Sequence, residues 1–288
     1  MVSVYLKLTS DGWKEVIKSD FWIDRPLLEK LKSLNKIQEN NWDGVIIIDG
    51  KERSGKSVLG MVCGWYLSQG KMTIQNFAKG LDDAARKISS LPDKSVLIMD
   101  EGSLVFSSKD SNSTAQKKLI KLMDVIGQKN MIFIICLPCY FDLNKTIAVR
   151  RSLFLCHVYP DAKYNRGNYA FFGERKKKIL YTLGKKNYDS YKEPSAEFIG
   201  RYLDFEPNFY KDYLELIKKE SLNEVLREAM LENKTPEQKI IECEALIYGW
   251  LLENGIMKQK ELVKIKGQAK ATISNRLSLY REEIKPNL

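Results

Sequence analysis

One short segment carries the residue types and the spacing of a phosphate-binding loop. It matches the pattern G-x-x-x-x-G-K-[ST] at every fixed position and reads Gly50-Lys51-Glu52-Arg53-Ser54-Gly55-Lys56-Ser57. Its glycines permit backbone angles that a Cβ would forbid, so the loop's N–H groups can turn inward around an anion at a helix N-terminus. The ammonium of Lys56 is then expected to reach the β- and γ-phosphates of a nucleotide, and the hydroxyl of Ser57 to ligate Mg²⁺. These eight residues and the next one, Val58, are the predicted nucleotide-binding set.

A second segment places two carboxylates directly after an apolar run. Val96–Met99 is followed by Asp100 and Glu101. If this run is a strand parallel to the one before the phosphate loop, Asp100 lies at the carboxyl edge of the sheet and can hold the water shell of Mg²⁺. Glu101 points differently and can polarise an attacking water. The pair favours an ATPase that hydrolyses with water over a kinase, and the alternative is a strand followed by an ordinary acidic turn.

Two adjacent arginines precede a later apolar run. Arg150 and Arg151 lead into Ser152–Tyr159. An arginine at this position can project to the nucleotide of a neighbouring subunit and stabilise the charge that develops at the γ-phosphate. Either residue could have this role. The alternative is a pair of surface arginines at a helix end.

The histidine and cysteine content limits other chemistry. His157 is the single histidine, which argues against a histidine-based metal site or catalytic triad. Cys136 and Cys139 have the spacing of a zinc or redox pair, but no second C-x-x-C motif accompanies them. The five cysteines are odd in number and lie mostly in apolar runs, which predicts a reducing, cytoplasmic compartment.

The elements that must position these residues alternate between short apolar runs and amphipathic segments. Such alternation predicts an α/β fold with a mostly parallel sheet and helices on both faces. Helices are expected at Lys56–Ser68 and Thr114–Gly127. A hairpin of Asn168–Phe172 and Lys178–Thr182, around a charged turn, is expected at the sheet edge. The predicted strands of the main sheet are Gly44–Asp49, Met72–Asn76, Ser95–Asp100, Met131–Leu137 and Ser152–Tyr159.

The chain is expected to divide into four parts. Residues 1–40 form a short extended segment followed by a helix that Pro26 opens, with leucines recurring at helical spacing. Residues 41–183 form the nucleotide-binding core. Residues 184–234 are a Tyr- and Lys-rich helical connector, and residues 235–288 are a small all-α domain.

The C-terminal part has the pattern of a helix-turn-helix. A helix is predicted from Pro236 to about Glu253, then two shorter helices, Lys258–Ile265 and Ala269–Glu283, joined by a turn that contains Gly267. Polar residues near the start of the last helix suit base edges and phosphates in a major groove. The predicted DNA-binding residues are Lys270, Thr272, Ser274, Asn275 and Arg276. The fragment AKATISNRLSLY resembles the recognition helices of helix-turn-helix and winged-helix domains. The alternative is a helical bundle with a solvated face.

Charge and hydropathy limit the classes of binding partner that this chain could have. The 288 residues carry a net charge of +10, from 47 Lys and Arg against 37 Asp and Glu. A basic balance of this size favours a polyanionic partner, either nucleic acid or an acidic membrane surface. No apolar stretch approaches the roughly 18 residues of a membrane span. The N-terminus has no apolar core of signal-peptide length, so neither a membrane span nor a secretion signal is expected.

The order of these motifs resembles the FtsK/HerA group of P-loop ATPases, including zonula-occludens-toxin-like and viral DNA-packaging members. The resemblance covers about residues 42–183: the phosphate loop, the Asp100-Glu101 strand, a helix, an apolar strand ending near LPCYFDL, and the arginine pair. It implies a RecA-like fold and a homo-oligomeric ring, often hexameric, that moves or unwinds DNA with ATP and Mg²⁺. In related ATPases the strand beside the Asp100 strand ends in a polar γ-phosphate sensor, commonly Gln. Here that place falls on Cys136 or just beyond it, and Gln128 is a weak substitute.

An ATP-driven DNA translocase or helicase is therefore the expected function. One alternative is a non-motor ATPase that loads or positions replication or partition proteins on DNA. Another is an ATPase of phage assembly or secretion, which would need a partner for membrane anchoring. A small-molecule kinase is disfavoured, because no acceptor site or lid motif is evident and the C-terminal domain would have no role.

Overall fold

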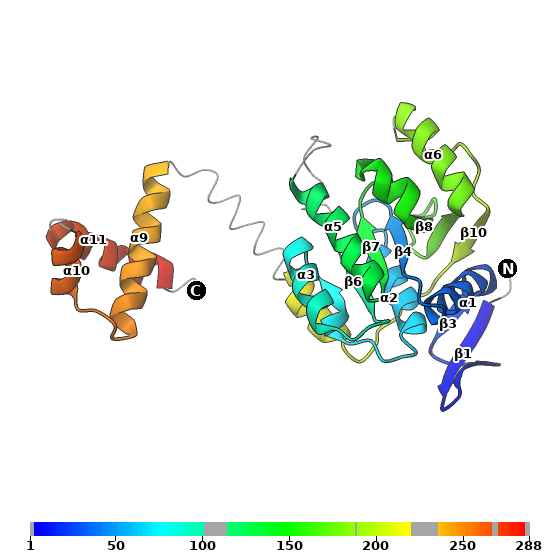
Figure 1. Ribbon diagram of the computed structural model, residues 1–288, viewed down its shortest axis with the longest axis horizontal. Helices are drawn as coiled ribbons and strands as arrows, with labels where there is room; N and C mark the ends of the chain where they lie inside the picture. The colour runs from blue at the N-terminus through cyan, green and yellow to red at the C-terminus, as the bar shows by residue number, and fades with distance from the viewer. Residues whose placement is uncertain (1–2, 101–113, 188, 220–235, 267–269, 286–288) are drawn as a thin grey trace. The chain divides into compact units, whose positions relative to one another are not determined.

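The computed structural model describes residues 3–100, 114–187, 189–219, 236–266 and 270–285 (Figure 1). The chain forms two compact units, Met1–Lys219 and Glu220–Leu288. The N-terminal segment 1–40 and the beginning of the expected connector therefore belong to the same unit as the phosphate loop.

A seven-stranded sheet organises the first unit, in the order β10-β9-β8-β4-β7-β6-β5. The strands from β8 to β5 run parallel, whereas β9 and β10 continue the sheet antiparallel. The mostly parallel α/β sheet predicted from the sequence is confirmed. The bounds of the strands are β4 Gly44–Asp49, β5 Phe77–Ala78, β6 Val96–Met99, β7 Ile132–Leu137, β8 Ser152–Tyr159, β9 Asn168–Phe172 and β10 Phe198–Arg201.

Helices cover both faces of this sheet, as the buried apolar clusters show. On one face, Ile46 and Ile48 of β4 pack with helices α1 (Arg25–Glu39) and α2 (Lys56–Leu67). On the other face, the alternate residues of β4 pack with α3, α5 and α6. Every residue of β4 and β7 is buried, which explains the unbroken apolar runs Val45–Ile48 and Ile132–Leu137. The helices of the second face are α3 Leu81–Ser90, α5 Thr114–Gln128 and α6 Glu174–Lys186 (Figure 1).

The N-terminal segment contains more strand than expected. In place of one extended piece, β1 (Ser3–Thr9), β2 (Gly12–Val16) and β3 (Trp22–Asp24) form a separate antiparallel sheet in the order β2-β1-β3. The predicted helix follows as α1, with Pro26 in its first turn. Its leucines lie on the buried face: Leu27, Leu28, Leu31 and Leu34.

The prediction of a hairpin at the sheet edge is wrong for its second strand. Lys178–Thr182 lies inside α6, and the strand that pairs with β9 is β10, with Phe198 opposite Phe171. The helix is favoured because residues 177, 180, 181 and 184 recur at helical spacing and are all buried. The sequence does not reveal this pattern, because one of the buried positions is a lysine, Lys177. It is fully buried and its Nζ donates to the carbonyls of Ala148 (3.0 Å) and Val149 (2.8 Å).

The strand expected at Met72–Asn76 is also displaced. Ile74–Asn76 is a 3₁₀ turn, and only Phe77–Ala78 forms β5. The side chain of Asn76 accepts from the backbone N–H of Thr73 (2.8 Å) and donates to the carbonyl of Val96 (2.7 Å). These side-chain bonds replace the ladder that an extended segment would have made here.

A buried carboxylate joins the two sheets of the first unit. Asp24, at the end of β3, is 2 % exposed, and the Tyr169 hydroxyl of β9 donates to its Oδ1. In the described part of the chain, its Oδ2 has no hydrogen-bond partner. Burial raises the pKa of Asp24 to about 6, against the Tyr169 hydrogen bond that lowers it.

Asp24→Asn is expected to stabilise the protein above pH 6. The folded state holds the Asp24 proton between about pH 4 and pH 6, where the unfolded state releases it, so this residue's contribution to stability falls as pH rises through that window. The neutral amide still accepts from Tyr169 without the cost of a buried charge. We expect a gain of about 1–3 kcal/mol at pH 8 that vanishes near pH 4, measured by urea unfolding.

Asp20→Asn provides the matched control, because Asp20 is exposed four residues earlier in the same segment. It should leave stability unchanged across the same pH range. A gain for Asp24→Asn that is equal at pH 4 and pH 8 would show that the effect does not come from the buried charge.

The second unit is helical. It contains α9 (Pro236–Glu253), α10 (Gln259–Lys266) and α11 (Lys270–Leu279), which continues into a π-helical turn at Tyr280–Ile284. Its small core consists of Tyr248, Leu262, Ile273 and Leu277. The residues of the predicted turn between α10 and α11, 267–269, lie outside the described residues.

Candidate nucleotide site

The phosphate loop connects the carboxyl end of β4 to the first residue of α2. Gly50 has φ +144° and Gly55 has φ +100°, both in the region that favours glycine. A Cβ on Gly50 would lie 2.1 Å from the carbonyl oxygen of Val158, and one on Gly55 would lie 2.3 Å from the hydroxyl of Tyr202. Both glycines are therefore required by backbone angle and by space.

Gly50→Ala is expected to distort the loop and abolish nucleotide binding. The clash is with a backbone oxygen of β8, which cannot rotate away, and the left-handed angle adds about 1–2 kcal/mol of strain. The measurement is nucleotide affinity by calorimetry together with the melting temperature. Gly80→Ala is the control, because a Cβ there meets nothing within 4 Å. Wild-type affinity in Gly50→Ala would contradict a role of this turn in binding.

Lys56 lies folded over the loop. Its Nζ donates to the carbonyls of Gly50 (2.9 Å) and Lys51 (2.8 Å), and burial lowers its pKa. Within the same loop, Ser54 is 4 % exposed and its Oγ has no hydrogen-bond partner among the residues that the structure describes. Within the described residues, the Lys56 ammonium therefore has carbonyl partners and the buried Ser54 hydroxyl has none. A phosphate group fits both, because its oxygens can accept from the ammonium and from the hydroxyl.

Asp100 directly follows the carboxyl end of β6 and lies beside this loop. It is 1 % exposed, and Ser57 Oγ donates to its Oδ1 at 2.8 Å. The Tyr213 hydroxyl donates to Oδ2, and the Lys218 ammonium lies 2.9 Å from the same oxygen. Burial by itself raises the pKa of Asp100, but the charge of Lys218 and the hydrogen bonds from Tyr213, Lys218 and Ser57 outweigh it and hold the pKa below its ordinary value.

These donors fit Mg²⁺. An ionised carboxylate and a hydroxyl in direct contact beside a phosphate loop are the oxygen ligands that Mg²⁺ takes, directly or through water, when phosphates supply the rest. Ser57 would ligate the ion and Asp100 would hold its water shell. Glu101, the predicted base that polarises water, lies outside the described residues.

A second buried carboxylate supports the entry to the loop. Asp49, the last residue of β4, is fully buried and accepts from the backbone N–H of Tyr140 (2.9 Å) and from the hydroxyl of Tyr191. Its Oδ1 lies 2.9 Å from His157 Nδ1, and the His157 ring stacks on Tyr191 with centroids 3.6 Å apart. Burial raises the pKa of Tyr191, which favours its neutral, donating form. The sole histidine thus helps to fix the residue before Gly50.

Residues 202–219, here called the strap, cover α2 on its outer side. Phe205 packs on Trp65 of α2 at 5.7 Å between ring centroids, and Phe209 packs on the same ring at 6.2 Å. At the start of the strap the Tyr202 hydroxyl donates to the carbonyl of Ser54 (2.9 Å), and at its end Tyr213 and Lys218 reach Asp100. The strap was missed from the sequence, although its aromatic residues at 202, 205, 209 and 213 recur at a spacing that could have identified a buried face.

The arginine pair lies at the opposite edge of the sheet from the phosphate loop. Ser152, which follows it, pairs with Val45 at the start of β4, whereas the loop leaves the end of β4. Arg151 Nη2 forms an ion pair with Asp43 (2.8 Å) and donates to the carbonyl of Met123 (2.8 Å). Arg150 is exposed. A role in a neighbouring subunit stays a prediction, and the internal partners of Arg151 favour Arg150 for it.

The place where the resemblance implies a sensor, Cys136 or just beyond it, lies at the end of β7. Cys136 is fully buried near the end of β7, and its Sγ lies 3.9 Å from the carbonyl of Lys56. Gln128 ends α5 at the amino edge of the sheet, since β7 begins at Ile132 and runs toward the loop. Gln128 is therefore wrong as a substitute sensor within its own chain.

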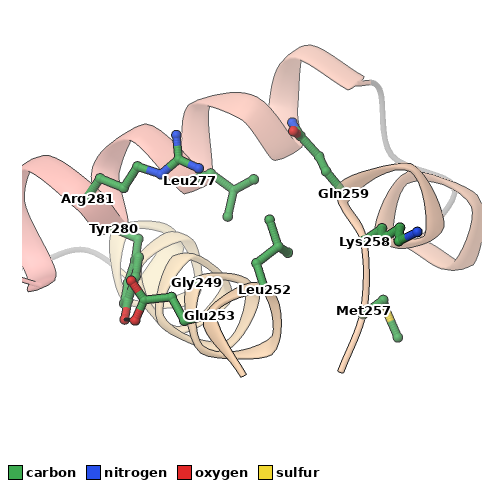
Figure 2. A pocket seen from close by; sticks show the side chains of 9 residues that line it. All are labelled: Gly249, Leu252, Glu253, Met257, Lys258, Gln259, Leu277, Tyr280 and Arg281. Atoms are coloured by element: carbon green, nitrogen blue, oxygen red, sulfur yellow. Dashed lines mark hydrogen bonds between the residues drawn. The ribbon is translucent and has the colours of Figure 1, made fainter. Parts of the chain in front are cut away.

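In the second unit the predicted DNA-binding residues lie on α11. Lys270, Ser274 and Asn275 are exposed and Thr272 is half-buried. Arg276 is half-buried and its Nε donates to Glu244 of α9 at 3.3 Å, so it ties the two helices together. Figure 2 shows a pocket of this unit where Leu252 and Leu277 face each other, and none of the five predicted residues lines it.

Comparison with known protein families gave no matching family model, and comparison with curated protein sequences gave no significant match. The residues and geometry of the site are therefore the basis for assigning a function.

Proposed function

We propose that this protein is a Mg²⁺-dependent ATPase of the P-loop type that acts on DNA as a ring-shaped translocase or helicase. One observation carries the ATPase assignment: Ser57 of the phosphate loop donates to the buried Asp100 at 2.8 Å, in the same loop region as the Lys56 ammonium. These are the positions that the G-x-x-x-x-G-K-[ST] motif requires for a metal-bound triphosphate.

Each side chain has a defined task in this proposal. Lys56 exchanges its bonds to the Gly50 and Lys51 carbonyls for oxygens of the β- and γ-phosphates. Ser57 and Asp100 hold Mg²⁺, which neutralises the charge that develops on the phosphates. Glu101 takes the proton of the attacking water, and Arg150 of a neighbouring subunit contacts the γ-phosphate.

The DNA assignment rests on charge and on the second unit. The chain carries a net charge of +10, and α11 presents exposed polar and basic residues at its start. Within the described residues, no helix is both long and apolar enough to span a membrane. All five cysteines are free, which supports a reducing, cytoplasmic compartment.

A non-motor ATPase that positions other proteins on DNA is the second candidate. It needs no site shared between subunits, and the internal ion pair of Arg151 leaves one fewer arginine for such a site. The test is ATP hydrolysis with and without single- and double-stranded DNA, beside a mass measurement in Mg·ATP. Stimulation by DNA together with a ring-sized mass supports the motor. Slow turnover by a monomer that binds DNA only with ATP supports the second candidate, and absence of ATP binding overturns both.

Deletion of residues 235–288 is expected to leave a folded ATPase with weakened DNA binding. The phosphate loop, sheet and strap all belong to the first compact unit. The log–log salt dependence of duplex binding should become shallower, by roughly 0.9 for each DNA phosphate that the protein no longer neutralises. The measurement is DNA affinity by anisotropy at several salt concentrations.

Lys270→Ala, at an exposed position of α11, should show a smaller loss of the same kind. Glu237→Ala, on the exposed first turn of α9, serves as its control in the same unit. If the truncated protein kept its DNA affinity and salt slope, the second unit would be better described as a protein-docking module.

A further inference from the structure

The last turn of the strap places a cation on the carboxylate that the metal requires. Lys218 Nζ lies 2.9 Å from Asp100 Oδ2, and the Tyr213 hydroxyl donates to the same oxygen. Asp100 is 1 % exposed and the Lys218 side chain is 32 % exposed, so the ammonium approaches from the solvent side. Its position is reinforced by the Tyr213 ring, whose centroid lies 5.8 Å from Nζ.

A buried carboxylate is costly without a cation in contact. Lys56, the loop's own lysine, is directed to the carbonyls of Gly50 and Lys51. In the protein without nucleotide, Lys218 therefore balances the charge of Asp100.

The attachment of the strap differs along its length. Its beginning is held by Tyr202, and its middle by Phe209, which packs between Trp65 and Phe77. In its last turn Leu214 and Leu216 are 45 % and 43 % exposed, while Ile217 is buried. This turn is therefore held by the buried side chains of Tyr213 and Ile217 and by the polar contacts of Tyr213 and Lys218 with Asp100.

Resting on the proposed function, we propose that Lys218 and Tyr213 are further residues of the nucleotide site, with Lys218 as the counter-cation of Asp100 that Mg²⁺ replaces when it arrives with a nucleoside triphosphate. A divalent ion bound near Ser57 and Asp100 would stand close to the ammonium and repel it. Lys218 then leaves, and the last turn of the strap loses its ionic anchor. The affected turn ends at Lys219, the last residue of the first compact unit.

The test compares nucleotide binding with and without Mg²⁺ in Lys218→Met, which keeps the length of the side chain and removes its charge. The probe is ADP, measured by calorimetry in Mg²⁺ or in EDTA on the full chain. The quantity to compare is the dissociation constant of ADP in EDTA divided by its dissociation constant in Mg²⁺. Loss of the competing ammonium should increase this ratio by about tenfold, which is the scale of one charged hydrogen bond. Lys219→Met, at the exposed neighbouring lysine, should leave the ratio unchanged.

A second measurement needs no variant. Hydrogen exchange of the backbone amides of residues 210–219 in the wild type should be faster with Mg·ADP than with ADP in EDTA. Slower exchange with Mg·ADP would overturn the proposal, because the strap would then close on the metal. Equal weakening of ADP binding in Lys218→Met with and without Mg²⁺ would also overturn it, and would make Lys218 a phosphate-binding residue. Failure of the wild type to bind ADP at all would instead refute the nucleotide site itself.

Discussion

Lys56→Ala is expected to reduce ATP hydrolysis by at least about 100-fold, to the level of background. The ammonium is the cation of the loop, and its backbone contacts hold it over the place where phosphates would bind. In the alanine variant the loop no longer places a cation beside the negative charge that develops on the γ-phosphate. Release of inorganic phosphate, followed at saturating ATP, measures the loss, and calorimetry separates weakened binding from slowed chemistry.

Lys51→Ala is the matched control for this change. Lys51 belongs to the same loop and carries the same charge, but it is exposed, and the structure uses its backbone carbonyl rather than its ammonium. Its loss should change turnover by less than about threefold, since exposed charges interact weakly through water. Equal losses in the two variants would mean that the loop attracts nucleotides by its overall charge and that Lys56 has no special position.

Glu101→Gln is expected to bind ATP with wild-type affinity and to turn it over about 10²–10⁴ times more slowly. The amide preserves the size of the side chain but cannot accept the proton of the attacking water. The neighbouring Asp100, which would hold the metal, is untouched, so binding in Mg²⁺ should persist. A stable ATP-bound complex that releases little phosphate is the result to look for, by rapid filtration and phosphate release.

Glu52→Gln removes the same charge from an exposed side chain of the phosphate loop. Because this loop is expected to contact the phosphates through its backbone N–H groups, the change should leave turnover unchanged. If Glu101→Gln hydrolysed ATP at the wild-type rate, the catalytic base would have to be another residue. The metal site formed by Ser57 and Asp100 could still stand in that case.

The central part of the fold was accessible from the sequence because its strands are buried on both faces. Gly44–Asp49 and Ser152–Tyr159 were predicted with the bounds that they have. Every residue of β4 is buried, which leaves the apolar run Val45–Ile48, and five of the eight residues of β8 are buried. The meeting of Ser57 with Asp100 was likewise expected, because the carboxyl ends of parallel strands share one edge of the sheet, although β7 lies between β4 and β6.

Other parts escaped prediction because a tertiary contact decided them. The face of α6 includes Lys177, which satisfies two carbonyls from a distant turn, so a charged residue occupies a buried helical position. In the sequence, Asp49 is simply a polar residue at the end of a strand. The structure is needed to show that Tyr140, His157 and Tyr191 surround it. Lys218 is one of many lysines in the sequence, and its meeting with Asp100 depends on a strap that crosses α2.

The pairing of β4 has a consequence for the synthesis of this protein. Its two neighbours in the sheet, β7 and β8, come from Ile132–Leu137 and Ser152–Tyr159, far downstream in the chain. A ribosome adds roughly 5–20 residues per second, so β4 emerges several seconds before either neighbour exists. During that time the run Val45–Ile48 exposes four β-branched apolar residues and unpaired backbone edges, the features that promote association between nascent chains. The strand that supports the phosphate loop is thus open to association with other chains for several seconds of its synthesis.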